Sequence, residues 1–202
     1  MRRWIPLLLV VAACSGPEEP PSVSPPEVTE DDLGDGSLDP PEEQTSRAIR
    51  RMSIPQVRAS MERVTGGITW TSGSTDLWEK YGSTLGVPDF QERTVEDRSP
   101  GVMFNKFLDD AAAAACDEWI TGELSSGFFT EASLEETDAE AIGRNIAALR
   151  RRIQGRAFAP DSEDVAAYQG LFDRVITRTE DPIQAWTTVC VALFTHPSFY
   201  AY

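Results

Sequence analysis

Histidine is almost missing from this sequence of 202 residues, which contains one histidine, His196, and three cysteines. A Ser-His-Asp triad or a multi-histidine metal site would depend on that one imidazole. The sequence also lacks a Gly-x-Ser-x-Gly elbow, a phosphate-binding loop, a His-Glu-x-x-His zinc motif and a dinucleotide fingerprint. We therefore predict no catalytic residue, no metal site and no cofactor, and an enzyme with an unfamiliar site stays open as an alternative.

Basic residues are missing from residues 15–46, which hold ten acids and many prolines. Such a segment has too little apolar surface to offset the entropy of ordering, so residues 14–46 are predicted to form a disordered tether. At ~3.1 Å per residue, a fully extended tether could reach about 100 Å. Part of it, from Asp31 to Glu42, resembles a calcium-binding loop, but Leu33 stands at a ligand position and the tether interpretation is preferred.

Acids also outnumber bases in the whole chain, 33 to 18, which gives a formal net charge of −15. Because this charge repels a phosphate backbone, nucleic acid is not an expected partner. Residues 47–202 are more balanced, with 23 acids and 16 bases, and they hold nearly all the aromatic residues. About 150 residues suffice for one domain with its own core.

Long apolar runs are also lacking, and the one candidate, Trp4–Ala13, is shorter than the roughly 20 residues that cross a bilayer. It follows Met1-Arg2-Arg3 and ends in Val11-Ala12-Ala13-Cys14, which resembles the lipobox of bacterial lipoproteins. The resemblance implies that residues 1–13 are a signal peptide and that Cys14 is lipidated in the cell envelope. Ser15 favours the outer membrane. An ordinary secreted protein with a chance cysteine is the alternative.

Residues 47–202 are predicted to be all-α, an irregular bundle of about five or six helices. Helical periodicity and capping residues predict these helices: Ile54–Val64 behind the capping box Ser53–Gln56; a short helix over Asp76–Tyr81; one from Ser99-Pro100 to Gly122; one from the capping box Thr137–Glu140 to Gly155; one capped by Asp161 or Ser162; and one from Asp181-Pro182 to His196. No alternating pattern predicts a strand. The last helix is the most apolar and is expected at the centre.

Cys116 and Cys190 remain after Cys14 is assigned to the lipid anchor. An exported chain meets an oxidising compartment, so the two are predicted to form a disulfide between helices. Two buried free thiols are the alternative.

Four groups of side chains are candidates for binding. Arg144, Arg150, Arg151, Arg152 and Arg156 form a dense basic cluster that suits an anion or an acidic partner, or else complements a helix dipole. His196 is expected to cap a helix end as a partly positive imidazole, with a ligand role as the alternative. Asp110, Asp117 and Glu118 could act as paired carboxylates but suit a solvated helix face better. Trp70, Trp78, Tyr81 and Phe90 are expected in the core rather than on a glycan platform.

Several stretches look familiar: Arg50–Ser53, Val64–Gly66, Arg156–Pro160, Glu163, Leu171-Phe172 and Leu193–Tyr200. Together they resemble the planctomycete-type, cytochrome c-associated envelope domains of unknown function. The chain departs from that family at Ala159 and His196, and it has no Cys-x-x-Cys-His to bind haem. The resemblance implies an envelope location and a link to electron transfer. The sequence thus favours a lipoprotein whose helical domain binds another envelope protein without catalysis, and the alternative is a redox accessory that docks on a cytochrome.

Overall fold

The computed structural model of the protein describes residues 49–88, 91 and 94–202. The chain divides into two units, Met1–Thr45 and Ser46–Tyr202, and all the described residues belong to the second. The predictions for the signal peptide, Cys14, the acidic tether, the calcium-like loop and Phe90 lie outside the described residues. None of the described helices combines the length and the hydropathy that crossing a bilayer requires.

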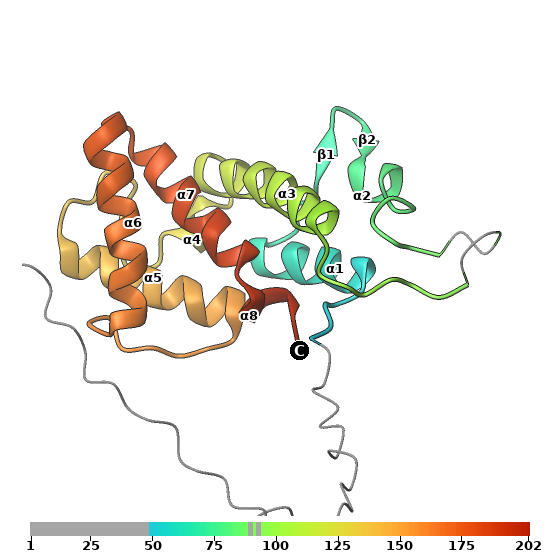
Figure 1. The fold of residues 1–202 in the computed structure, drawn as a ribbon. Helices are drawn as coiled ribbons and strands as arrows, with labels where there is room; N and C mark the ends of the chain where they lie inside the picture. Colours follow the sequence, from blue (N-terminus) through green and yellow to red (C-terminus); the bar gives the residue numbers. More distant parts are fainter. Residues whose placement is uncertain (1–48, 89–90, 92–93) are drawn as a thin grey trace, which may run out of the picture. The chain divides into compact units, whose positions relative to one another are not determined.

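The second unit is mostly helical, which confirms the all-α class (Figure 1). Its elements are α1 (Ile54–Thr65), β1 (Thr71–Ser72), β2 (Thr75–Asp76), α2 (Leu77–Lys80), α3 (Val102–Thr121), α4 (Ser125–Phe128), α5 (Ala139–Gln154), α6 (Glu163–Thr179), α7 (Pro182–Thr195) and α8 (Pro197–Tyr200). Five of these helices have 12 to 20 residues and correspond to five of the predicted ones, while α2, α4 and α8 are four-residue turns.

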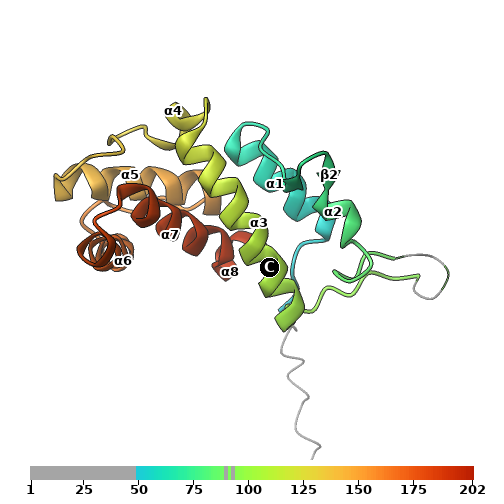
Figure 2. The same ribbon diagram turned by 90° about the horizontal axis from the view of Figure 1, so that it is seen from above.

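Helices α3 and α7 form the centre of the unit and lie side by side in both views (Figures 1 and 2). Helix α3 presents the buried Ala111, Ala112 and Ala115, whose small side chains permit a close approach. Helix α7 buries its whole inner stripe, as its apolar sequence predicts. A disulfide joins Cys116 of α3 to Cys190 of α7, with 6.0 Å between the Cα atoms.

Helices α5 and α6 complete the larger part of the unit around α7 (Figure 1). Gly143 lies at this contact, where a Cβ would be 2.8 Å from the side-chain nitrogen of Gln169 and 3.2 Å from the carbonyl oxygen of Pro160, so a larger residue would displace the Gln169 side chain. Gln169 also donates a hydrogen bond to the carbonyl oxygen of Ala139. These contacts fix the start of α5 against α6.

A small hairpin corrects the expectation that the domain has no strands. Strands β1 and β2 pair antiparallel, with Thr71 opposite Asp76 and Ser72 opposite Thr75. Gly73 in the connecting turn has φ of +59°, a left-handed conformation that glycine adopts at little cost. Two-residue strands are too short to show alternation, which explains why periodicity does not detect them.

Two helix boundaries differ from the sequence prediction, and a short helix is added after a third. Helix α3 begins at Val102 behind Gly101, rather than at Ser99-Pro100. Helix α5 is capped by Asp138, whose side chain accepts from the backbone N–H of Ala141, so the predicted capping box of Thr137 with Glu140 is not formed. Pro197 ends α7 as expected, but it also opens α8, because proline is well suited to the first turn of a helix.

The two ends of the described chain meet at one place. Arg51 and Ala201 form an isolated antiparallel bridge, and the backbone N–H of Tyr202 donates to the carbonyl oxygen of Arg50 over 2.9 Å. The backbone N–H of Arg51 donates to the carbonyl oxygen of Arg98 over 3.1 Å. The segment that enters the unit is therefore held both by the last residues of the chain and by the loop before α3.

Candidate functional site

The five arginines of the predicted basic cluster do not form one site. Arg150 is buried, and its guanidinium carbon lies 3.5 Å from the ring centre of Phe158 and 5.3 Å from that of Tyr168. Its Nε donates to the side-chain oxygen of Gln154, and its Nη1 lies 3.6 Å from a carboxylate oxygen of Asp164. This stacked, paired arginine packs α5 against α6, so its role is structural.

Arg152 is also occupied by structural contacts. Its Nε donates to the carbonyl oxygen of Val64 over 2.7 Å, and its Nη1 donates to that of Gly127 over 2.8 Å. Its guanidinium carbon lies 5.1 Å from the ring centre of Trp119. The side chain therefore ties α5 to the end of α1 and to α4.

The other three arginines make fewer structural contacts. Arg144 forms an i,i+4 ion pair with the exposed Glu140. Arg151 and Arg156 are exposed, and neither side chain makes a hydrogen bond or ion pair within the described residues. Arg144 and Arg151 border a groove of about 240 Å³ on α5, whose other lining residues are Glu131, Ala147, Ala148, Phe158 and Pro160. The α5 groove thus combines a free guanidinium with a small apolar floor.

His196 caps the start of α8, where its Nδ1 accepts a hydrogen bond from the backbone N–H of Ser198 over 3.0 Å. Burial lowers the pKa of His196 below 6.5, and the positive charges of Arg150 and Arg156 lower it further, while Asp164 partly opposes them. His196 follows the end of α7 as expected, but its side chain caps the start of α8 instead, and the lowered pKa disfavours the partly positive imidazole that was expected. A neutral ring is the form that can accept through Nδ1.

The remaining sequence candidates are structural. Asp110 forms an ion pair with Lys106 on the surface of α3, and Asp117 and Glu118 are exposed on the same helix, as a solvated face would be. Trp70 and Trp78 are buried, with ring centres 5.3 Å apart. Tyr81 is half-buried and stacks near Phe107 of α3, so these aromatics belong to the core as preferred.

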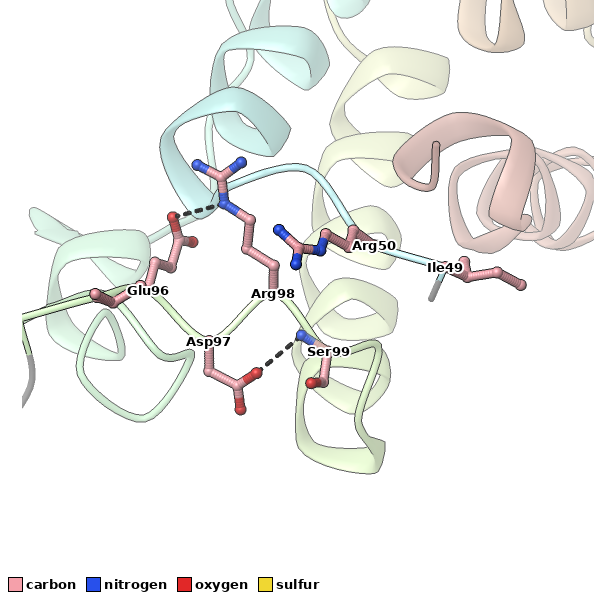
Figure 3. A pocket seen from close by; sticks show the side chains of 7 residues that line it. Ile49, Arg50, Glu96, Asp97, Arg98 and Ser99 are labelled. Carbon is pink, nitrogen blue, oxygen red and sulfur yellow. Dashed lines mark hydrogen bonds and ion pairs between the residues drawn. The ribbon is translucent and has the colours of Figure 1, made fainter. Parts of the chain in front are cut away.

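A second pocket, which sequence patterns do not predict, lies where the chain enters the unit (Figure 3). It has a volume of about 470 Å³ and is called the entrance pocket here; Ile49, Arg50, Val95, Glu96, Asp97, Arg98 and Ser99 line it. Its acidic side chains are engaged, because Glu96 accepts from the backbone N–H of Ile54 over 2.8 Å and Asp97 accepts from that of Ser99 over 2.9 Å.

The basic side chains of the entrance pocket differ from each other. Arg98 donates from Nη1 to the hydroxyl oxygen of Tyr202 over 3.0 Å, and its Nε lies 3.8 Å from Glu96. The guanidinium of Arg50 makes no hydrogen bond or ion pair within the described part of the chain. A free cation beside two exposed apolar side chains, Ile49 and Val95, suits a ligand that is both anionic and apolar.

A buried arginine, Arg51, holds in place the loop that forms this pocket. The side chain of Arg51 is 2% exposed and donates to the carbonyl oxygens of Met52, Leu85, Asp97 and Ser99. It also pairs with Glu96 at 3.3 Å and lies over the ring of Phe104. Because its acceptors come from the entering segment and from both ends of the loop before α3, Arg51 fixes the loop that forms the pocket.

Within the same described ranges, no three His, Cys, Asp or Glu side chains gather as metal ligands would. Comparison with known proteins adds no relative, since no family model, no curated protein and no solved structure matches the chain. The described residues thus form an all-α unit with two candidate binding sites, the α5 groove and the entrance pocket.

Proposed function

We propose that this chain is a lipid-anchored protein of the bacterial envelope whose helical unit binds another envelope protein without catalysing a reaction. The anchor is Cys14, at the end of the short apolar run that follows Met1-Arg2-Arg3. The outer membrane is the proposed location, because Ser15 follows the lipidated cysteine.

The disulfide between Cys116 and Cys190 carries this proposal. Disulfides persist in oxidising compartments and are rare in the cytosol, so a bridge across the two central helices supports export. It also accounts for both cysteines that lipidation would leave over, since the chain has three in total. Each of the three cysteines therefore has a role that fits an exported, lipid-anchored protein.

The α5 groove supports a protein partner of acidic character. Arg151 extends without an ion-pair partner in the described part of the unit, next to the apolar floor made by Ala147, Ala148 and Phe158. Arginine forks match carboxylates, and small apolar floors accept a partner's side chain closely. The resemblance to cytochrome-associated envelope domains supports an alternative partner, a cytochrome.

Metabolic labelling with palmitate tests the anchor. The wild-type chain should carry label and sediment with envelope membranes, whereas a Cys14→Ala variant should not be labelled. A matched Cys116→Ala variant should keep its label, because its sulfur belongs to the proposed disulfide. Equal labelling of the wild type and the Cys14→Ala variant would contradict the lipid anchor.

Capture after chemical cross-linking in intact cells tests the partner. Arg151→Ala should reduce the recovered partner, while the control Arg178→Ala, an exposed arginine near the end of α6, should not. Recovery of a haem protein would favour the redox accessory, and recovery of a haem-free acidic protein would favour the binding module. Equal recovery with both variants would contradict a role for the α5 groove.

A further inference from the structure

Large apolar side chains that are exposed gather at one end of the unit. The described part of the chain has six of them: Ile49, Val95, Val102, Met103, Leu124 and Tyr202. All except Leu124 fall in three short segments, residues 49–52, 95–103 and 200–202. Val95 is 78% exposed and Val102 is 84% exposed, so these side chains have no cover within the described unit.

The three segments form one surface, which we call the entrance face. Arg50 exchanges backbone hydrogen bonds with Tyr202, and Arg51 donates to the carbonyl oxygen of Arg98. Phe104, just after the second segment, packs edge-on against Tyr200 with ring centres 5.2 Å apart. Figure 2 shows the start of α3 near the C-terminal end and the entering segment.

The entrance face is slightly basic within an acidic unit. Its segments carry three arginines against two acids, whereas residues 47–202 carry 16 bases against 23 acids. Arg51 and Glu96 are paired inside, so the accessible charges are Arg50, Arg98 and the exposed Asp97, and Arg98 also lies 3.8 Å from Glu96. Apolar side chains interspersed with arginines are the composition of surfaces that bind at the lipid headgroup level.

We infer that the entrance face docks on the bilayer surface, with Ile49, Val95 and Val102 at the level of the headgroups and Arg50 and Arg98 against lipid phosphates. This inference rests on the proposed lipid anchor at Cys14. The described unit begins at Ile49, which belongs to the entrance face, so the chain that leads from Cys14 joins the unit at this face. The 34 residues between Cys14 and Ile49 are rich in proline and acids, and at ~3.1 Å per residue they could span up to roughly 100 Å.

Tethering explains why a small face suffices. A link that can span the distance makes the second contact intramolecular and raises its effective concentration, so weak contacts become occupied. A free protein with these few apolar side chains would bind a bilayer poorly, because membrane affinity scales with buried apolar area. The anchor and the face therefore act together.

An environment-sensitive fluorophore on an introduced cysteine tests the docking in the full, acylated chain. The dye is attached to Val95→Cys on the face or to Ser74→Cys, an exposed control in the β1–β2 turn. Both proteins are inserted into vesicles of three parts phosphatidylethanolamine and one part phosphatidylglycerol. Docking should raise the emission at position 95 at least about twofold and expose it to quenching by spin-labelled lipid, with no change at position 74.

Paired substitutions locate the effect. Ile49→Ser with Val102→Ser should return the emission at position 95 to the control value, whereas Leu124→Ser, which removes an exposed large apolar side chain outside the face, should not. A vesicle-bound, acylated chain whose dye at position 95 stays in water would overturn the inference, and it would leave the proposed function standing. Absence of the acyl group, read from the mass of the intact chain, would overturn both.

Discussion

At the scale of single residues, Trp186 shows most directly what packing contributes. Its ring is fully buried and lies against Phe128, Phe129 and Phe172, at centre distances of 5.8, 5.6 and 4.8 Å. We expect Trp186→Ala to lower the free energy of unfolding by about 3–5 kcal/mol, because the truncation leaves a cavity. Denaturant unfolding measures this loss.

Trp186→Phe provides the matched control. The buried indole N–H has no hydrogen-bond partner among the described residues, so its removal leaves no acceptor unpaired. This variant should cost under about 1.5 kcal/mol. An alanine variant that costs no more than the phenylalanine variant would refute the central position of the ring.

His196 should give the unit a pH dependence that begins near neutrality. Its folded-state pKa lies below the ordinary 6.5, so the unfolded chain takes up the proton first as the pH falls. The stability that the neutral ring contributes is present above pH 6.5 and is lost as the pH falls through the folded pKa. The unfolding free energy should therefore be lower at about pH 5.5 than at about pH 7.5.

His196→Asn separates this effect from the titration of carboxylates. An asparagine side chain can still accept from the backbone N–H of Ser198, and it does not titrate. The wild type should lose stability relative to this variant between the two pH values. Parallel curves for the two proteins would show that the imidazole is not responsible.

The arginines show where sequence reasoning stops at this scale. Adjacent positions suggest one cluster, yet Arg150 stacks between rings, Arg152 binds two carbonyl oxygens, and only Arg151 and Arg156 extend freely. Arg51 carries no signal of burial in the sequence, because its acceptors on Leu85 and Asp97 lie 34 and 46 residues away. Charged side chains find their roles through tertiary contacts that local patterns do not encode.

At the scale of elements, local signals work where the chain itself supplies both partners. The capping box of Ser53 with Gln56 is present with both hydrogen bonds, and Gly155 ends α5 in the left-handed conformation as predicted. The prediction for the start of α5 fails because two neighbouring residues, Thr137 and Asp138, can both cap. In the structure Asp138 is the cap, and the side chain of Glu136 accepts from the backbone N–H groups of both residues.

The pairing of α3 with α7 leads to the prediction at this scale. The disulfide spans a sequence separation of 74 residues, and closing a loop of that length stabilises a chain by roughly 4 kcal/mol on the entropy model. Cys116→Ala with Cys190→Ala should lower the unfolding free energy by up to that amount. The wild type treated with a reductant should approach the variant.

Peptide mapping without reduction provides the independent check. A linked peptide that contains Cys116 and Cys190 should appear after digestion of the alkylated, unfolded protein. Alkylation of both cysteines in the unreduced wild type would contradict the bridge. The measurement also tests the contact between the two helices.

At the scale of the whole molecule, the described unit is closed by its own residues. The entering segment pairs with the C-terminal end through Arg51 and Ala201, and nothing before Ile49 is required for that bridge. Deletion of residues 15–46 should therefore leave the helical circular dichroism and the melting temperature unchanged.

A deeper truncation sharpens this test. A chain that starts at Ser53 lacks the bridge and the buried guanidinium of Arg51, so its melting temperature should fall. Loss of stability already in the first deletion would show that the acidic segment packs on the unit. Equal melting of all three proteins would show that the entering segment contributes little.

The all-α fold class could be predicted from the sequence, but the way the helices pack against one another could not. Apolar periodicity and caps locate the long helices, because both depend on neighbours three or four residues apart. The position of α7 beside α3 was suggested only by two cysteines, and the entrance pocket was not suggested at all. That pocket forms from segments about 45 residues apart in sequence, such as Arg51 and Glu96, which only the folded chain brings together.

The neighbouring ends of the unit also determine how a mechanical force would act on it. A pull on the backbone that leads into Ile49 would reach the bridge between Arg51 and Ala201 before any helix. The next resistance is the guanidinium of Arg51, which is bonded to four carbonyl oxygens and to Glu96. Rupture under load is governed by the rate of unfolding. The rate at which Arg51 leaves its acceptors would then limit how long the helices stay folded under such a load.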